Sequence, residues 1–325
     1  MDSTCPCCAP PWDLEIRRIT GFFTVKVYDL FGNLLWIGDQ GTDTTTGVAI
    51  DSSGNVYTSG LALGTSSFNI LEKRDPDGSL TASVPWSSSG ADGVAVNSSG
   101  VYLLMEDASV DKYDFDLNLV GTLPESNGFV SFTAVTEFHK IAAIGDLVTV
   151  TARTGGSTFT IAVWEADALI NITAPNRTGT LSGLEIDGTN IFTSVSSTSS
   201  NSFTTWETTG AIVSSNGGAA ISAMGINGSS IFGTYGGSTP ITGLVQKING
   251  GNPIGANAAG YYAGSVPGSL GGFPPVNIPT KIKLYIPSDV LQWSNDWSTD
   301  PNDRIAEIVT SSNRVYAVGN RGQAT

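Results

Sequence analysis

Cysteine and histidine are almost missing from this chain of 325 residues. The three cysteines, Cys5, Cys7 and Cys8, all lie at the N-terminus, and the single histidine is His139. No disulfide can therefore link distant parts of the chain, so its stability has to come from the burial of apolar surface. One histidine excludes a histidine-rich metal site. A Ser-His-Asp or Cys-His hydrolase would have to use His139, and no Gly-x-Ser-x-Gly motif accompanies it.

Basic residues and long apolar runs are scarce as well. Lysine and arginine number 15 against 29 aspartates and glutamates, which gives a net charge of −14. Nucleic acid and anionic membrane surfaces are therefore poor candidates as partners, because neutralising phosphate needs clustered lysine and arginine. No apolar run reaches the length of about 18 residues that a membrane-spanning helix needs, so no membrane insertion is expected.

The first twenty residues lack a basic region followed by an apolar region, which is the pattern of a secretory signal. We therefore expect no signal peptide and synthesis in a cytoplasm. If the protein ends up outside a cell, we expect it to leave by lysis, as part of a virion or other particle, or by an export route that uses no N-terminal signal peptide.

Periodic runs of helix-forming residues are nearly absent, whereas glycine (39) and proline (15) are frequent. Charged residues make up 14% of the chain, compared with about 25% in typical soluble domains. This composition predicts an all-β protein with many turns.

The stretch Gly47–Gly60 is the unit around which the chain is organised. Val48 and Ile50 alternate with small residues, the string Asp51-Ser-Ser-Gly-Asn55 has turn chemistry, and a second β-prone run begins at Val56. Copies of this hairpin occur at Gly93–Tyr102, Ala142–Val148, Gly183–Phe192, Ala223–Phe232 and Ala306–Tyr316. A period of about 40–45 residues built of short strands is typical of β-propeller blades. The hairpin would supply the two inner strands of each blade.

A second recurring hairpin would supply the two outer strands of each blade. It is predicted at Val27–Trp36, Lys73–Leu80, Lys112–Leu119, Val163–Leu169, Thr205–Ile212, Gln246–Ile254 and Leu284–Leu291. The seventh inner hairpin is expected between Ile254 and Lys281, where only Ala256–Tyr262 resembles one. Seven outer hairpins predict seven blades.

The two ends of the chain carry complementary halves of one blade. The chain begins with an outer hairpin, Thr24–Ile37, and ends with an inner hairpin, Ile305–Val318. Joined, they would close the ring, and closure removes the free edges of an open sheet. We predict a propeller over residues 21–325, with a Gly/Pro-rich insertion at about 264–280, and an extended arm over residues 1–20.

The arm is either a disordered terminus or an anchor that packs on a neighbouring protein subunit. Its prolines keep it extended, and the residues expected to serve assembly are Cys5, Cys7, Cys8 and Trp12. The gaps between the cysteines are too short for a zinc pair, and three thiolates lack a fourth ligand. Inert thiols, intersubunit disulfides and a metal site shared between subunits all stay open.

The string Gly47-Val-Ala-Ile-Asp-Ser-Ser-Gly-Asn-Val-Tyr57, followed by Lys73-Arg-Asp-Pro-Asp-Gly-Ser-Leu80, resembles the bacterial seven-bladed β-propeller repeats related to NHL repeats. In that family an Asp-x-x-Gly-Asn turn joins the first two strands of a blade. An Asp-x-x-Gly-x-Leu turn joins the last two. The resemblance covers about residues 21–320 and is strongest in the first two blades. It implies a propeller that serves as a binding platform, a structural module or, in some members, a lyase.

Ligands of propellers usually bind at the end of the central channel where the chain enters the innermost strands. The residues predicted to lie at this channel mouth are Asp43, Asp92, Glu137, His139, Lys140 and Arg304. They are either a small-ligand site or ordinary polar residues of surface loops. No cofactor or metal is expected. Neither Asp75-Pro-Asp-Gly78 nor Asp114-Phe-Asp-Leu-Asn118 is followed by the calcium-loop pattern of a glycine at position six and a glutamate at position twelve, and their role as turns explains them.

Two classes of function stay open at this point. The first is a non-enzymatic structural and binding propeller, displayed on a large assembly such as a phage virion as a capsid decoration or a tail protein, with a host-surface glycan as a further partner. The second is a lyase-like enzyme or carbohydrate-binding protein that uses His139 and Glu137 at the channel mouth. A cytoplasmic hub that binds peptides is a third interpretation, which nothing in the sequence favours.

Overall fold

The computed structural model describes residues 23–40, 44–62, 68–86, 90–105, 107, 109–124, 140–154, 158–173, 180–196, 202–217, 221–227, 230–235, 245–249, 254–256, 262–266, 281–285, 291–296, 304–310 and 314–320. Throughout this part of the chain the regular elements are β-strands, which confirms the all-β prediction. No helix long and apolar enough to cross a membrane occurs among these residues.

The described strands form seven sheets, numbered here from the N-terminus. Sheet 1 holds β1 (Phe23–Asp29), β2 (Leu34–Gln40), β26 (Arg304–Thr310) and β27 (Arg314–Asn320). Sheet 2 holds β3 (Thr44–Ile50), β4 (Val56–Ala62), β5 (Phe68–Arg74) and β6 (Leu80–Trp86). Sheet 3 holds β7 (Ala91–Asn97), β8 (Gly100–Met105), β9 (Val110–Tyr113) and β10 (Leu119–Thr122).

The other sheets continue this order along the chain. Sheet 4 holds β11 (Lys140–Ile144), β12 (Leu147–Thr154), β13 (Thr158–Glu165) and β14 (Ala168–Thr173). Sheet 5 holds β15 (Thr180–Ile186), β16 (Asn190–Ser196), β17 (Ser202–Glu207) and β18 (Ile212–Gly217). Sheet 6 holds β19 (Ile221–Asn227), β20 (Ser230–Tyr235) and β21 (Val245–Asn249), and sheet 7 holds β22 (Ile254–Ala256), β23 (Tyr262–Val266), β24 (Lys281–Tyr285) and β25 (Leu291–Asp296).

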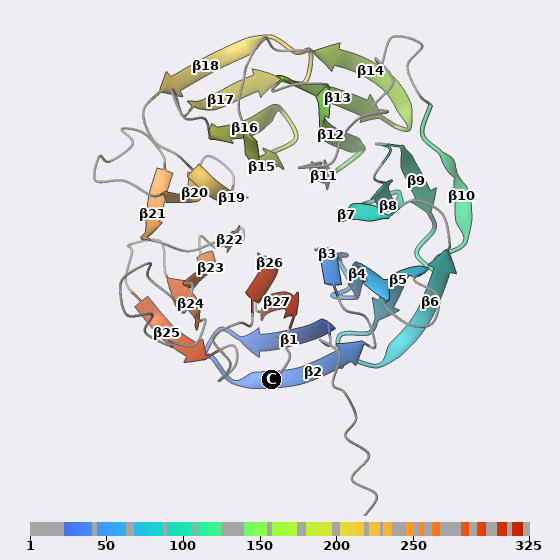
Figure 1. The fold of residues 1–325 in the computed structure, drawn as a ribbon, viewed down its shortest axis with the longest axis vertical. Coiled ribbons are helices and arrows are strands. Elements are labelled where there is room, and N and C mark those ends of the chain that lie inside the picture. Colours follow the sequence, from blue (N-terminus) through green and yellow to red (C-terminus); the bar gives the residue numbers. More distant parts are fainter. Residues whose placement is uncertain are drawn as a thin grey trace, which may run out of the picture.

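The sheets lie around a common centre, and each presents one strand toward it (Figure 1). The innermost strands are β3, β7, β11, β15, β19, β22 and β26, and each contacts the innermost strands of the two neighbouring sheets. Gly47 on β3 permits one such close approach, because a Cβ at this position would lie 2.7 Å from the backbone nitrogen of Val94 on β7. The glycine of the recurring inner hairpin therefore has a packing role.

Sheet 1 is built from both ends of the chain. Its order is β2-β1-β27-β26, and β1 pairs with β27 along its whole length, from Phe23 opposite Asn320 to Asp29 opposite Arg314. The outer hairpin near the N-terminus and the inner hairpin near the C-terminus are therefore hydrogen-bonded into one antiparallel sheet, as their complementary sequence patterns predict.

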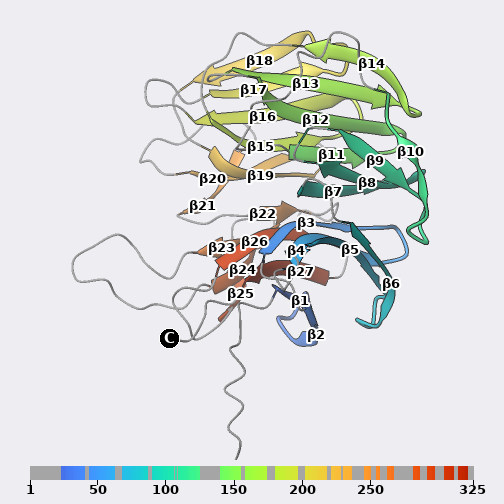
Figure 2. The same ribbon diagram turned by 45° about the vertical axis from the view of Figure 1, so that its right-hand side comes forward.

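The apolar core lies between neighbouring sheets. Figure 2 shows sheets 4 and 5 packed against one another, and the cluster that joins them includes Ile161 and Val163 from β13 with Ile191 and Trp206 from sheet 5. Middle strands are buried on both faces, so β8 is buried along its whole length. This explains why its sequence, Gly-Val-Tyr-Leu-Leu-Met, reads as a continuous apolar run without alternation.

Two joints on either side of sheet 1 use the same tryptophan contact. Trp36 on β2 donates from Nε1 to the carbonyl oxygen of Pro76 in sheet 2, at 2.9 Å. Trp293 on β25 donates in the same way to Leu30 in sheet 1, at 3.1 Å. Each indole therefore ties the outermost strand of one sheet to the outer turn of the next.

The prediction of an outer hairpin at Gln246–Ile254 is wrong. β21 pairs in parallel with β20, and Ile254 instead begins β22, which pairs with β23 as the inner hairpin of sheet 7. The Gly-Gly-Asn-Pro sequence at 250–253 has the composition of a turn, but this composition does not specify which sheet the following strand joins. The predicted inner hairpin around Ala256–Tyr262 is present. Of the predicted insertion, residues 264–266 belong to β23 and residues 267–280 lie outside the described residues.

Candidate functional site

One end of the sheets carries the recurring turns of the sequence, and we call it the turn face. It comprises the turns at residues 51–55, 97–100 and 144–147 between inner strands and those at 29–33, 75–79, 114–118, 165–168 and 207–211 between outer strands. All lie at one end because each antiparallel strand returns the chain to the opposite end.

The Asp-x-x-Gly-Asn string forms a turn held by its own side chains. Asp51 Oδ1 accepts hydrogen bonds from the backbone nitrogens of Ser53 and Asn55 at 2.8 and 2.9 Å. Asp51 Oδ2 accepts from the side-chain amide of Asn55 at 2.7 Å. These bonds satisfy backbone donors that the tight turn would otherwise leave to solvent.

The outer turns at Asp29–Asn33 and Asp114–Asn118 repeat this arrangement, with hydrogen bonds of 2.7–2.9 Å. At Asp114 the side-chain amide of Asn118, assisted by backbone N–H groups, lowers the pKa of the carboxyl. These carboxylates therefore serve the turn, in agreement with the explanation based on turn chemistry.

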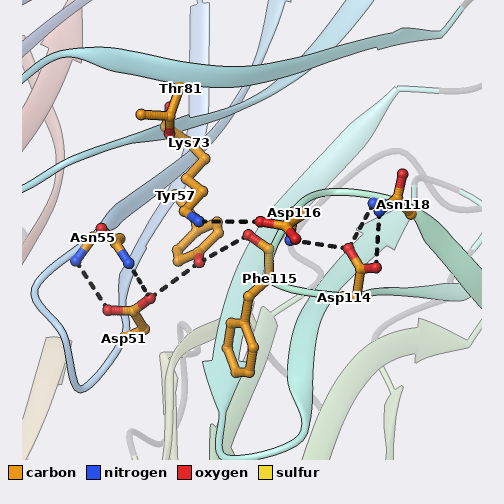
Figure 3. Close-up of polar contacts among 9 residues, drawn as sticks. All are labelled: Asp51, Asn55, Tyr57, Lys73, Thr81, Asp114, Phe115, Asp116 and Asn118. Atoms are coloured by element: carbon orange, nitrogen blue, oxygen red, sulfur yellow. Dashed lines mark hydrogen bonds and ion pairs between the residues drawn. The ribbon is translucent and has the colours of Figure 1, made fainter.

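A tyrosine and a lysine link the turns of sheets 2 and 3 (Figure 3). The Tyr57 hydroxyl donates to Asp51 Oδ2 at 3.1 Å and lies 3.5 Å from the carbonyl oxygen of Phe115 in sheet 3. Lys73 Nζ lies 3.8 Å from Asp116 Oδ1. Burial, followed by the charge of Asp51, raises the pKa of the Tyr57 phenol well above its usual range, so it stays a proton donor.

The same link recurs between sheets 3 and 4. The Tyr102 hydroxyl donates to Asp167 Oδ1 at 3.0 Å, and Lys112 Nζ lies 2.5 Å from Asp167 Oδ2. Burial alone would lower the pKa of Lys112, but the hydrogen bond to Asp167 and the neighbouring Tyr102 outweigh it and raise the pKa. We call this pair of contacts, from a Tyr and a Lys of one sheet to the outer turn of the next, the turn latch.

A pocket of about 540 Å³ opens on the turn face across sheets 2, 3 and 4. Its apolar lining comes from the ends of three innermost strands and one outer turn: Ile50, Val96, Phe115, Ala143 and Ile144. Its polar lining comes from the turns that follow these strands: Asp51, Ser52, Ser53, Asn55, Asn97, Ser98 and Gly145. Ser98 Oγ donates to the carbonyl oxygen of Gly145 at 2.8 Å, which joins the turns of sheets 3 and 4 beside the pocket.

The outermost strands expose large apolar side chains at recurring positions. The residue directly after each of four outer turns is between 47% and 60% exposed: Leu34, Leu80, Leu119 and Ile212. In three of these strands the next residue is also a large exposed apolar one: Leu35, Val120 and Val213. We call these seven residues the apolar rim.

The residues predicted at the channel mouth lie at the other end of the innermost strands. Asp92 is near the start of β7, Lys140 begins β11 and is exposed, and Arg304 begins β26. Since β7 contacts β11 and β26 contacts β3, the structure gathers the starts of these strands around the same end. Asp43, Glu137 and His139 lie outside the described residues, so a ligand site there stays a prediction.

The assembly residues Cys5, Cys7, Cys8 and Trp12 also lie outside the described residues. Within the part of the chain that the structure describes, no three His, Cys, Asp or Glu side chains are grouped as metal ligands. Sequence reasoning missed the pocket on the turn face, because the strings at 51–55 and 97–100 signal turns and do not reveal that three sheets bring them together.

One family of repeats matches this chain. The β-propeller repeat family SBBP matches residues 34–68, which run from β2 through β3 and β4 to the first residue of β5. The match covers a small part of the chain, and together with the sheets arranged around a centre it supports a β-propeller repeat fold. A search of curated protein sequences finds no match to it.

Solved structures resemble this propeller at low sequence identity. Raptor from Chaetomium thermophilum superposes with a TM-score of 0.62 and 8% identity, covering 92% of this chain and 30% of the Raptor chain. A chain of the Mitotic Checkpoint Complex has a TM-score of 0.52 and 12% identity, covering 84% and 86%. KlAtg21, solved with the coiled coil of AgAtg16, has a TM-score of 0.51 and 13% identity, covering 77% and 84%.

At these identities the likeness concerns the fold alone. This propeller spans about a third of the length of Raptor, so the activities and partners of that protein cannot be transferred to it. The propeller fold suggests a role in binding or as a scaffold.

Proposed function

We propose that this protein is a closed seven-bladed propeller that binds other protein chains and catalyses no reaction. The seven described sheets would be its blades, and sheet 1, assembled from both ends of the chain, would close the ring. The circuit of contacts among the innermost strands supports this arrangement. A ring without free inner edges is a rigid platform, and rigidity favours a scaffold that presents surfaces to partners.

The apolar rim is the observation that carries the binding role. Single exposed apolar residues are ordinary, but here they recur at one structural position on the outermost strands of four sheets. These strands also have an unpaired edge in the described sheets, and such edges pair readily with other chains. A neighbouring protein subunit that covers the rim would bury both features.

We further propose that the neighbours are subunits of a large particle, such as a phage virion, which the protein decorates on the capsid or joins in the tail. The proposed setting combines synthesis in a cytoplasm with an arm, residues 1–20, that packs on the adjacent subunit. The arm would contribute Cys5, Cys7, Cys8 and Trp12 to this contact.

The native mass tests this proposal by size-exclusion chromatography with light scattering. We expect the full-length protein, whose monomer mass is 33.7 kDa, to form an oligomer, and removal of residues 1–20 to shift it toward a monomer. Replacing Leu119 and Val120, which are 60% and 63% exposed, by serine should also weaken assembly without lowering the melting temperature. Ile144→Ser, on the turn face, is the matched control. If all four proteins were monomers, self-assembly through these surfaces would be contradicted.

A further inference from the structure

We propose that the pocket on the turn face binds an extended peptide segment of a partner protein that carries an apolar side chain flanked by lysine or arginine. This inference extends the proposed binding function to a second surface, separate from the apolar rim. It rests on the shape and lining of the pocket and on the charge around it.

The floor of the pocket suits an apolar side chain. Val96 and Phe115 from sheet 3 and Ala143 from sheet 4 are partly buried, and Ile144 is 41% exposed. The volume, about 540 Å³, falls within the range of about 300–1,000 Å³ typical of ligand pockets. An aliphatic or aromatic side chain that enters it would remove Ile144 from water, which is the main source of affinity in such a contact.

The charge around the pocket selects a basic partner. Asp51 lines it, Asp116 directly follows Phe115, and Asp146 directly follows Gly145. Asp146 is exposed, and the Asp116 side chain is 87% exposed at 3.8 Å from Lys73, so both charges remain available to a ligand. Lys112 is engaged with Asp167 in the second turn latch.

Charge complementarity therefore favours lysine and arginine on either side of the apolar anchor. The net charge of −14 acts in the same direction over longer distances, because it attracts cationic ligands and speeds their association. A neutral glycan could donate hydrogen bonds to these carboxylates but would gain no charge attraction from them, and an acidic glycan would be repelled, so we assign the pocket to a basic peptide.

The position of the pocket favours an extended segment. Its lining residues follow the ends of β3, β7 and β11, which are successive innermost strands, so the site runs along an arc and not down one narrow hole. Ser52, Ser53 and Ser98 are exposed along this arc and offer hydroxyl groups to a peptide backbone.

Binding of short labelled peptides to the full-length protein, measured by fluorescence anisotropy, tests the inference. The probe alternates lysine and leucine, and its controls replace leucine by serine or lysine by glutamate. We expect saturable binding of the lysine–leucine peptide alone, weakening as salt rises from about 50 to about 500 mM because screening reduces the charge term.

Substitutions in the pocket test whether the peptide binds there. Ile144→Ser should weaken binding by about tenfold, as loss of one apolar anchor does, and Asp116→Asn and Asp146→Asn by about twofold to fivefold each. Glu207→Gln, an exposed carboxylate on the turn of sheet 5, is the matched control and should bind as the unchanged protein does.

Three results would overturn the inference. They are no binding of the lysine–leucine peptide, binding that Ile144→Ser and Asp146→Asn leave unchanged, and stronger binding of a neutral glucose oligomer that Ile144→Ser abolishes. The proposed assembly function is judged separately by native mass, which depends on the arm and the rim. Oligomers without peptide binding would therefore refute only the pocket, whereas peptide binding by a permanent monomer would refute only the assembly.

Discussion

The glycine at the fourth position of several turns is needed for its backbone conformation and, in two turns, also for close packing. Gly32, Gly54 and Gly78 adopt φ values of 84° to 94°, a region that side chains disfavour. At two of them a tryptophan also packs on the bare glycine: a Cβ on Gly78 would lie 2.7 Å from Trp36, and a Cβ on Gly32 would lie 2.8 Å from Trp293. The glycines are thus part of the joints on either side of sheet 1.

Replacing Gly78 and Gly188 by alanine should separate the cost of the positive φ from the cost of the clash with tryptophan. Gly188 has a similar φ of 92°, but its nearest neighbour is 4.0 Å from the position of a Cβ. We expect Gly188→Ala to cost about 1 kcal/mol for the backbone alone. Gly78→Ala should cost about 1–3 kcal/mol more, because the indole of Trp36 has to move.

Urea-induced unfolding of both variants measures the difference. Equal losses of unfolding free energy at the two glycines would show that the contact with Trp36 contributes nothing.

The carboxylate of Asp114 makes stability depend on pH in a direction that its hydrogen bonds determine. The hydrogen bonds from Asn118 and the backbone lower the pKa of Asp114 in the folded protein. A lowered pKa stabilises the fold above the ordinary pKa of the carboxyl, and this contribution is lost as the pH falls through the folded value.

Asp114→Asn should therefore melt below the unchanged protein at pH 7, and the gap should close as the pH falls below the ordinary carboxyl pKa of about 4. Thermal melts followed by circular dichroism across this range measure it. A gap that stays constant with pH would assign the effect to geometry and not to charge.

At the scale of elements, the turn latch connects sheet 2 to sheet 3 and sheet 3 to sheet 4. Tyr57 and Tyr102 occupy equivalent positions on β4 and β8, and Lys73 and Lys112 each lie two residues before the aspartate of an outer turn. The second latch is the tighter, because Lys112 reaches Asp167 at 2.5 Å and Asp167 is 39% exposed, whereas Lys73 reaches Asp116 at 3.8 Å and Asp116 is 87% exposed.

A double-mutant cycle with Lys112→Met and Asp167→Asn should give a coupling of about 0.5–1 kcal/mol, because Asp167 is partly exposed to solvent. The equivalent cycle with Lys73→Met and Asp116→Asn should give a coupling close to zero, since Asp116 is almost fully exposed. Chemical unfolding of the four proteins in each cycle supplies the values. A larger coupling for Lys73 than for Lys112 would contradict this ranking.

The whole molecule depends on the pairing of its two ends in sheet 1. Deleting residues 305–325 removes β27 and nearly all of β26, and leaves β1 with a free edge and the apolar residues Val25 and Val27 uncovered. We expect this truncated protein to aggregate or to lose cooperative melting, because exposed edges pair with other chains.

Deleting residues 321–325 instead keeps β27 intact and serves as the control. Solubility and calorimetry distinguish the two proteins. A soluble, cooperatively melting protein without residues 305–325 would refute closure through sheet 1.

The sequence by itself determined the local elements of this protein. Asp51, Gly54 and Asn55 specify a turn because the carboxylate satisfies nearby donors and glycine accepts a positive φ, and these are local requirements that any copy of the string meets. The hairpins on either side, and the match between the two ends in sheet 1, followed from the same local patterns.

Only the tertiary structure decided which elements meet. It paired β21 with β20 in parallel, left Leu119 exposed on the outermost strand, and brought Tyr102 to Asp167, which is far away in the sequence. It also gathered three turns around one pocket at the end opposite the predicted channel mouth. These outcomes depend on how sheets pack against one another, and packing is set by the shapes of whole apolar faces, which no single turn or strand encodes.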